Sequence, residues 1–172
     1  MFVLSKMLIV IVTVLAAVWD LKTYRIPNWL TFSAMLLGFV ISAFGAGAPG
    51  GIRDALIGFG VGFAVMLPFF LFGVMGGGDV KLAAAFGALG GLQFVINALL
   101  MGALLGGAFA LVYLVWQKGL RDAFKKVFCD MLALFVFGVG PESEMEMVMP
   151  YGVFVSLGAF LALFCEVIRI AA

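Results

Sequence analysis

The sequence contains no histidine and only two cysteines. Without histidine the chain cannot form a Ser-His or Cys-His nucleophile pair, a His-liganded zinc site or the HExxH helix of metalloproteases. Cys129 and Cys165 form no CxxC pair and are too few for a four-cysteine metal site, so we interpret them as two free, buried thiols. We therefore expect no metal and no cofactor, and any chemistry must come from carboxylates, Lys, Tyr or Cys.

Charge is also scarce, since 11% of the 172 residues are charged and 66% are hydrophobic. An ordinary soluble domain has roughly 25% charged and roughly 45–50% apolar residues. So few charges cannot solvate a domain of this size, whereas a lipid bilayer accepts an apolar surface. The net charge of +1 gives no indication of nucleic-acid binding. The composition predicts an all-α, polytopic membrane protein that forms a single domain over residues 1–172.

At about 20 apolar residues per crossing, the chain has room for about six transmembrane helices. Their approximate ranges are 2–19, 29–44, 55–75, 82–91, 94–116 and 150–168. The stretch from Leu82 to Trp116 is nearly uncharged and too long for one crossing, so we expect a tight turn near Gly90 to Gln93. Residues 119–148 combine a basic stretch, a short apolar run and an acidic stretch, and are expected to form a cytoplasmic or interfacial loop.

Glycine is abundant, with 23 residues. Several pairs have GxxxG spacing, namely Gly58/Gly62, Gly73/Gly77, Gly87/Gly91 and Gly102/Gly106. This spacing predicts close packing between helices of the same chain, and a dimer face is the alternative interpretation.

Counting the crossings places two aspartates on the same side of the membrane. The first helix delivers Asp20 to one face, the second leaves that face, and the third returns to it and delivers Asp79. Most basic residues are predicted on this face, so the positive-inside rule makes it cytoplasmic and leaves both termini outside. The basic residues expected there are Lys22, Arg25, Lys81, Lys118, Arg121, Lys125 and Lys126, against Lys6, Arg53 and Arg169 on the other face.

Asp20 and Asp79 are the candidate catalytic residues. An Asp at the centre of a membrane helix costs about 2.5–3.5 kcal/mol, and less near the interface, so its presence in a span suggests a function. Two neighbouring carboxyl groups share one proton, and one member then takes a proton from water while the other donates to a peptide carbonyl. The three glycines before Asp79 let an extended peptide approach the backbone. A simple interfacial turn with Asp79 directed to water is the alternative interpretation.

Two motifs resemble those of a known family. Asp20-Leu-Lys-Thr-Tyr-Arg-Ile-Pro-Asn28 and Gly76-Gly-Gly-Asp-Val-Lys-Leu82 resemble the two aspartate motifs of the type IV prepilin peptidases, which are GxGD intramembrane aspartic proteases. Pro150-Tyr151-Gly152 resembles a third landmark of that family. The resemblance implies that Asp20 and Asp79 form the catalytic pair. It also implies removal of a short basic leader from prepilin-like substrates, after a glycine at the cytoplasmic border of the substrate's hydrophobic segment.

The same resemblance suggests which residues bind substrate or support the site, namely Gly76, Gly77, Gly78, Lys81, Pro27, Asn28, Pro150 and Tyr151. Two interpretations of Lys81 stay open. In one its positive charge changes the acidity of the aspartate pair, and in the other its ammonium group anchors the helix at the lipid headgroups. An acidic patch predicted on the same face consists of Glu142, Glu144 and Glu146. It is either a solvated loop or a patch that attracts the basic leader electrostatically.

Several alternatives to this assignment stay open. Larger members of the family carry a zinc-containing domain between the first two spans and also N-methylate the pilin. Here that connection is only Asp20 to Asn28 and lacks cysteine, so we do not expect methyltransfer. The short form resembles the inner-membrane peptidases of Flp/Tad-type pili and also the archaeal preflagellin peptidases. The remaining alternatives are a presenilin-like GxGD protease, a small ion-coupled transporter and a non-catalytic scaffold for pilus assembly.

Overall fold

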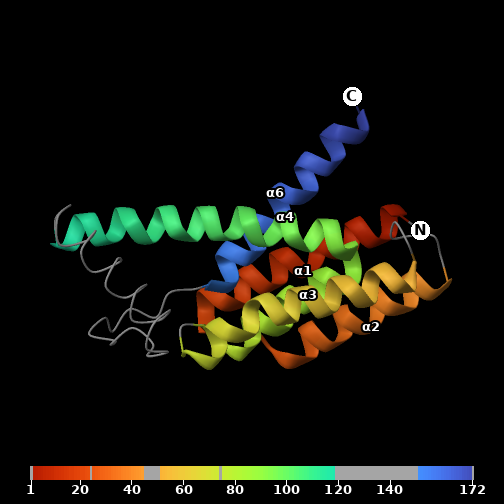
Figure 1. Ribbon diagram of the computed structural model, residues 1–172, viewed down its shortest axis with the longest axis horizontal. Helices are drawn as coiled ribbons and strands as arrows, with labels where there is room; N and C mark the ends of the chain where they lie inside the picture. Colours follow the sequence, from red (N-terminus) through yellow and green to blue (C-terminus); the bar gives the residue numbers. More distant parts are fainter. Residues whose placement is uncertain (1, 24, 45–50, 74, 119–150, 172) are drawn as a thin grey trace.

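A computed structural model shows how the apolar segments are arranged and describes residues 2–23, 25–44, 51–73, 75–118 and 151–171 (Figure 1). Every regular element within these ranges is an α-helix. In chain order the helices are α1 (Phe2–Thr23), α2 (Asn28–Phe44), α3 (Ile52–Leu71), α4 (Gly77–Lys118) and α6 (Tyr151–Ala171). The prediction of an all-α membrane protein is confirmed.

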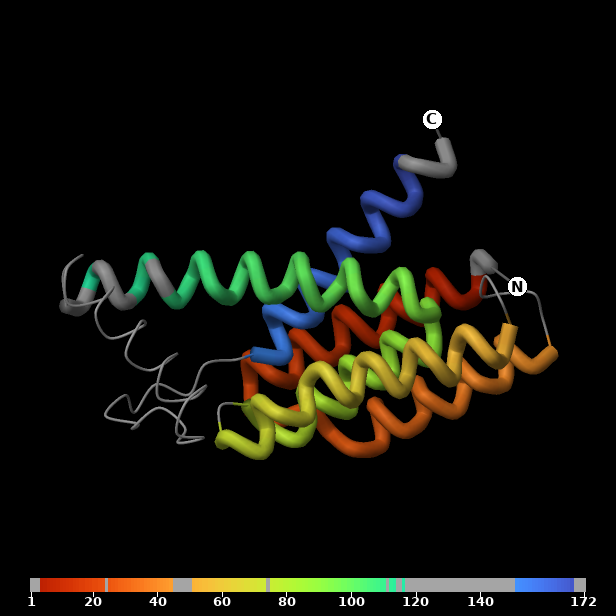
Figure 2. The backbone as a smooth tube through the Cα atoms, in the orientation of Figure 1, coloured from red at the N-terminus to blue at the C-terminus, as the bar shows by residue number. Residues whose placement is uncertain are grey.

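The long helix α4 consists of two helices that meet at a kink. Gly91 has φ 79° and ψ −176°, a conformation that interrupts the helix and favours glycine. Figure 2 shows the green part of the tube reversing direction, so that residues 77–90 run beside α3 and residues 92–118 run back. The turn expected near Gly90 to Gln93 coincides with this kink.

The outer surface of the helices suits a lipid environment. Among the described residues, four helical segments are long and apolar enough to cross a membrane, namely Leu4–Thr23, Ile52–Leu71, Gly77–Ala110 and Tyr151–Ile168, and Asn28–Phe44 is a shorter apolar helix. Large apolar side chains such as Phe44 and Leu104 are exposed on this surface. A helix satisfies its backbone hydrogen bonds internally, so such segments are stable where no water is present. The chain is a multi-pass membrane protein.

Small residues bring the helices of the bundle into close contact. A Cβ at Gly87 would overlap the carbonyl group of Gly58, and one at Gly62 would lie 2.5 Å from the carbonyl oxygen of Ala83. These contacts join α3 to residues 77–90 of α4, so at these positions the GxxxG pattern serves packing within the chain. In lipid, burial of apolar surface does not drive helices together, and such backbone contacts supply the attraction through van der Waals packing.

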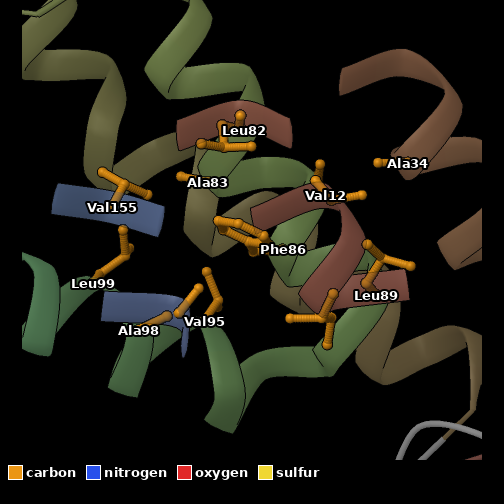
Figure 3. Packing of buried hydrophobic residues seen from close by; sticks show 14 of the residues in the cluster. Val12, Ala34, Leu82, Ala83, Phe86, Leu89, Val95, Ala98, Leu99 and Val155 are labelled. Atoms are coloured by element: carbon orange, nitrogen blue, oxygen red, sulfur yellow. The ribbon is translucent and has the colours of Figure 1, made fainter. Parts of the chain in front are cut away.

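The first part of α4 lies at the centre of the bundle. Its residues 82–86 are all buried, and Figure 3 shows the Phe86 ring with Val12 of α1, Leu82 of α4 and Val155 of α6 around it. Figure 1 shows that α1 and α3 end, and that α2, α4 and α6 begin, at the same end of the bundle. We call this the aspartate end, because Asp20 and Asp79 lie there. The structure thus agrees with the crossing count that places both aspartates on one side.

Candidate active site

Asp20 lies in the last turn of α1 and is buried, with 4% of its surface exposed. We expected the first span to end near Trp19, but the helix continues to Thr23. The Thr23 hydroxyl lies 2.9 Å from the carbonyl oxygens of both Trp19 and Arg25, so its single proton is shared between a carbonyl in the final turn and one two residues further along the chain. Asp20 is therefore held on a helix and does not lie in a loop.

The beginning of α6 holds the Asp20 carboxylate. The N–H of Val153 donates to Asp20 Oδ2 at 3.1 Å, and the N–H of Gly152 also donates to this carboxylate. The first amides of a helix have no partner within the helix, and they bind anions readily. A Cβ at Gly152 would lie 2.9 Å from Asp20 Oδ2 and 2.8 Å from Ile26 Cδ1. Glycine at this position therefore allows the carboxylate to reach the amides.

Asp79 lies in the first turn of α4 and is also buried, with 7% of its surface exposed. The N–H of Gly76 donates to Asp79 Oδ2 at 3.3 Å, and the N–H of Asp79 donates to the Gly76 carbonyl at 3.1 Å. Gly78 packs against Ile26, where a Cβ would lie 3.1 Å from the Ile26 Cβ. The alternative of an interfacial turn with Asp79 directed to water is wrong, because the side chain is buried within the bundle.

The two aspartates are close enough for their charges to interact, as are Asp79 and Tyr151. The site therefore combines residues from α1, the beginning of α4 and the beginning of α6, together with Ile26 between α1 and α2. Gly77 and Gly78 belong to the first turn of α4, and only Gly76 of the three predicted glycines precedes the helix. The contacts of Gly152, Val153 and Ile26 with the two aspartate motifs were not predicted. Only Gly152 had a signal in the sequence, because it belongs to the Pro-Tyr-Gly motif at the start of α6.

Lys81 joins α4 to α2 at the aspartate end. Its Nζ donates to Asn28 Oδ1 at 2.8 Å and lies 5.4 Å from the centroid of the Phe32 ring. Pro27 accepts a hydrogen bond from the N–H of Leu30 at 3.1 Å, so the predicted residues Pro27 and Asn28 form the beginning of α2.

Cys165 is a free cysteine, but it is exposed, so the expectation that this thiol is buried is wrong. Pro150, the loop 119–148 and its acidic residues Glu142, Glu144 and Glu146 lie outside the described residues. Within the part of the chain that the structure describes, no group of three or more His, Cys, Asp or Glu side chains is placed to hold a metal ion.

Fold and site together define a multi-pass helical membrane protein with two buried, interacting carboxyl groups at one end of the bundle. The sequence model of the type IV leader peptidase family matches residues 7–111, which include both aspartates. The chain belongs to this family, and the resemblance drawn from its motifs is confirmed.

Curated relatives carry names consistent with this family. The chain is 34% identical over 106 residues to a prepilin leader peptidase/N-methyltransferase of Stutzerimonas stutzeri, an alignment that covers 58% of this chain and 36% of that protein. It is 34% identical over 109 residues to a protein of the same name from Pectobacterium carotovorum subsp. carotovorum, covering 59% and 37%. The chain therefore spans little more than a third of the length of these relatives. No solved structure gives a significant match.

Proposed function

We propose that this protein is an aspartic endopeptidase that removes the short basic leader from type IV prepilins of the Flp/Tad-like class at the cytoplasmic face of the inner membrane. The observation that carries the proposal is the buried pair Asp20 and Asp79 in a member of the leader peptidase family. The two side chains come from different helices, and each is oriented by backbone amides.

The proposed reaction uses the carboxyl pair to activate water. The ionised member takes a proton from water, and the oxygen of that water forms a bond to the scissile carbonyl carbon. The protonated member donates its proton to the carbonyl oxygen. The tetrahedral intermediate then breaks its carbon–nitrogen bond, and a proton from the pair goes to the leaving amine. The amides that orient Asp20 and Asp79 reduce the reorganisation needed during these steps.

Gly76 and Tyr151 are proposed to support the substrate next to the pair. Gly76 is exposed, carries no Cβ and precedes α4, so an extended peptide can approach its backbone. Tyr151 is near Asp79 and carries a hydroxyl group that can donate to a substrate carbonyl. Lys81 and Asn28 are proposed to position the site without touching the substrate, because their hydrogen bond joins the start of α4 to the start of α2.

The orientation and the absence of methyltransfer are parts of the same proposal. Lys22, Arg25 and Lys81 lie at the aspartate end, which supports a cytoplasmic location under the positive-inside rule. α1 ends at Thr23 and α2 begins at Asn28, so the connection is too short to hold a folded domain of the kind that larger family members insert there. We therefore propose peptidase activity without N-methylation.

The test is co-expression with a leader-bearing prepilin, followed by separation of the precursor from the shorter product. Asp20→Asn and Asp79→Asn are each expected to reduce cleavage by at least about 10²-fold, because each removes one proton-transfer group. Asp54→Asn is the matched control, since Asp54 lies in the first turn of α3 at the opposite end of the bundle. Cleavage at the wild-type rate by either of the first two variants, with normal membrane insertion, would refute the carboxyl-pair mechanism.

A further inference from the structure

The buried side chain of Ile26 lies where the starts of α4 and α6 come together. Ile26 belongs to the connection between α1 and α2, yet only 7% of its surface is exposed. Its Cβ lies 3.1 Å from the point that a Cβ on Gly78 would occupy, and its Cδ1 lies 2.8 Å from the corresponding point on Gly152. Because neither glycine has a side chain, Ile26 packs against the backbone of both helices.

Each of these glycines is next to one carboxyl group of the pair. Gly78 directly precedes Asp79 in the first turn of α4. The N–H of Gly152, at the start of α6, donates to the Asp20 carboxylate. A change in the spacing between the two helix starts would therefore change the spacing between the two carboxyl groups.

The backbone that carries Ile26 is held on both sides. Before it, the Thr23 hydroxyl lies 2.9 Å from the carbonyl oxygen of the residue that precedes Ile26. After it, the side chain of Asn28 accepts a hydrogen bond from Lys81 of α4 at 2.8 Å. Isoleucine is branched at Cβ, so its χ1 torsion is stiffer than that of leucine or methionine. A stiff side chain on an anchored backbone can act as a spacer between two helices.

We propose that Ile26 is a positioning residue that sets the separation between Asp20 and Asp79. The inference rests on the proposed function and adds a residue that acts through the backbone of Gly78 and Gly152 without touching water or substrate. In the proposed reaction one carboxyl group takes a proton from water while the other donates to the carbonyl that this water attacks. Both groups must fit the same water and the same peptide bond, and a misplacement of about 1 Å can cost about 10²-fold in rate.

Ile26→Val tests the spacer, because it removes only Cδ1, the atom that packs against Gly152, and keeps the branched Cβ at Gly78. We expect kcat for prepilin cleavage to fall by about threefold to tenfold and KM to stay within about twofold. Ile9→Val is the matched control, since Ile9 is also buried and lies about 16 Å of helix before Asp20. It loses the same carbon and should keep the wild-type kcat.

Two kinetic results would contradict the proposal. If Ile26→Val has the same kcat as Ile9→Val, the Cδ1 contact does not position the pair. If Ile26→Val raises KM and leaves kcat unchanged, the side chain contacts the substrate and is not a spacer.

A double substitution tests the contact between Ile26 and Gly152 itself. Ile26→Val combined with Gly152→Ala removes one carbon from one side of the contact and adds one on the other. The kcat of the double variant should exceed the value expected from multiplying the two single effects by about threefold or more, because residues in contact are not independent. Ile9→Val combined with Gly152→Ala should show simple multiplication. Multiplication in both double variants would overturn the proposal.

A spectroscopic measurement separates this proposal from the proposed function. The protein is labelled with carbon-13 at the side-chain carboxyl of aspartate, and the resonances of Asp20 and Asp79 are assigned by their loss in Asp20→Asn and Asp79→Asn. At least one of the two should shift in Ile26→Val and neither in Ile9→Val, with no substrate present. Unshifted resonances in Ile26→Val, in a protein that cleaves prepilin, would overturn the spacer alone. A wild-type protein that cleaves no prepilin would overturn the proposed function and the spacer with it.

Discussion

Substituting Gly152 by alanine should lower activity far more than stability. The added methyl carbon would lie 2.9 Å from Asp20 Oδ2 and 2.8 Å from Ile26 Cδ1. Both atoms are at the ends of side chains, so they can move away while the backbone keeps its place. To reach an ordinary contact of at least 3.4 Å, the Asp20 carboxylate must shift by about half an ångström. Alanine also has the higher helix propensity, by about 1 kcal/mol in a helix interior, which offsets the repacking.

The shift moves a proposed proton-transfer group. A misplacement of about 1 Å at a reacting centre can cost about 10²-fold in rate, so half that displacement should lower kcat/KM by about tenfold to a hundredfold. This corresponds to about 1.4–2.7 kcal/mol of transition-state stabilisation. The assay measures initial rates of leader removal in proteoliposomes, together with the thermal unfolding temperature of the same preparations.

Gly60→Ala is the control for this substitution, because a Cβ at position 60 meets no atom within 4 Å. It should keep the wild-type rate. If Gly152→Ala has wild-type kcat/KM and unfolds at the wild-type temperature, the amide contacts of Asp20 do not position a reacting group and the reasoning fails. If Gly152→Ala loses activity only because the protein unfolds, the contact between Asp20 and the amides of α6 serves stability alone, and the reasoning that it positions a reacting group also fails.

Three further substitutions test other contacts. Lys81→Met removes the hydrogen bond to Asn28, worth about 0.5–1.5 kcal/mol, and should lower the thermal unfolding temperature by a few degrees while Lys81→Arg retains more of it. Gly87→Ala would overlap the backbone of Gly58 and should destabilise the bundle by about 1–3 kcal/mol, measured by unfolding in detergent. Asp20→Ala should unfold at a lower temperature than Asp20→Asn, because alanine leaves buried amides without an acceptor at a cost of about 1–3 kcal/mol each, and both variants should be inactive.

Much of the fold was predictable, because a membrane allows few arrangements. Apolar runs bounded by Gly, Pro and charges become helices, and counting them places Asp20 and Asp79 at the same end without any knowledge of packing. The kink at Gly91 was predicted from length alone, since the stretch from Leu82 to Trp116 exceeds one crossing. The number of crossings and the cytoplasmic face stay predictions.

The partners of the aspartates were not predictable from the same rules. Asp20 and Val153 are separated by 133 residues, and nothing in the hydropathy pattern specifies which helix begins next to the end of α1. That contact depends on how α6 packs on α1 and α4, and therefore on the volumes of buried residues such as Phe86 and Ala159. Lys81 illustrates the same limit, because its hydrogen bond to Asn28 requires the relative positions of α2 and α4.

The contact between Asp20 and α6 also explains how a buried acid is retained in this bundle. The first amides of α6 have no partners within their helix, and an unsatisfied amide in a dry environment costs several kcal/mol. Asp20 has the complementary need, because a buried carboxylate must accept hydrogen bonds. Each group therefore satisfies the other, so the arrangement that orients Asp20 for chemistry is also the arrangement that stabilises the start of α6. Asp79 is oriented locally by Gly76, and the geometry of the pair consequently depends on one contact close in sequence and one that only the assembled bundle can form.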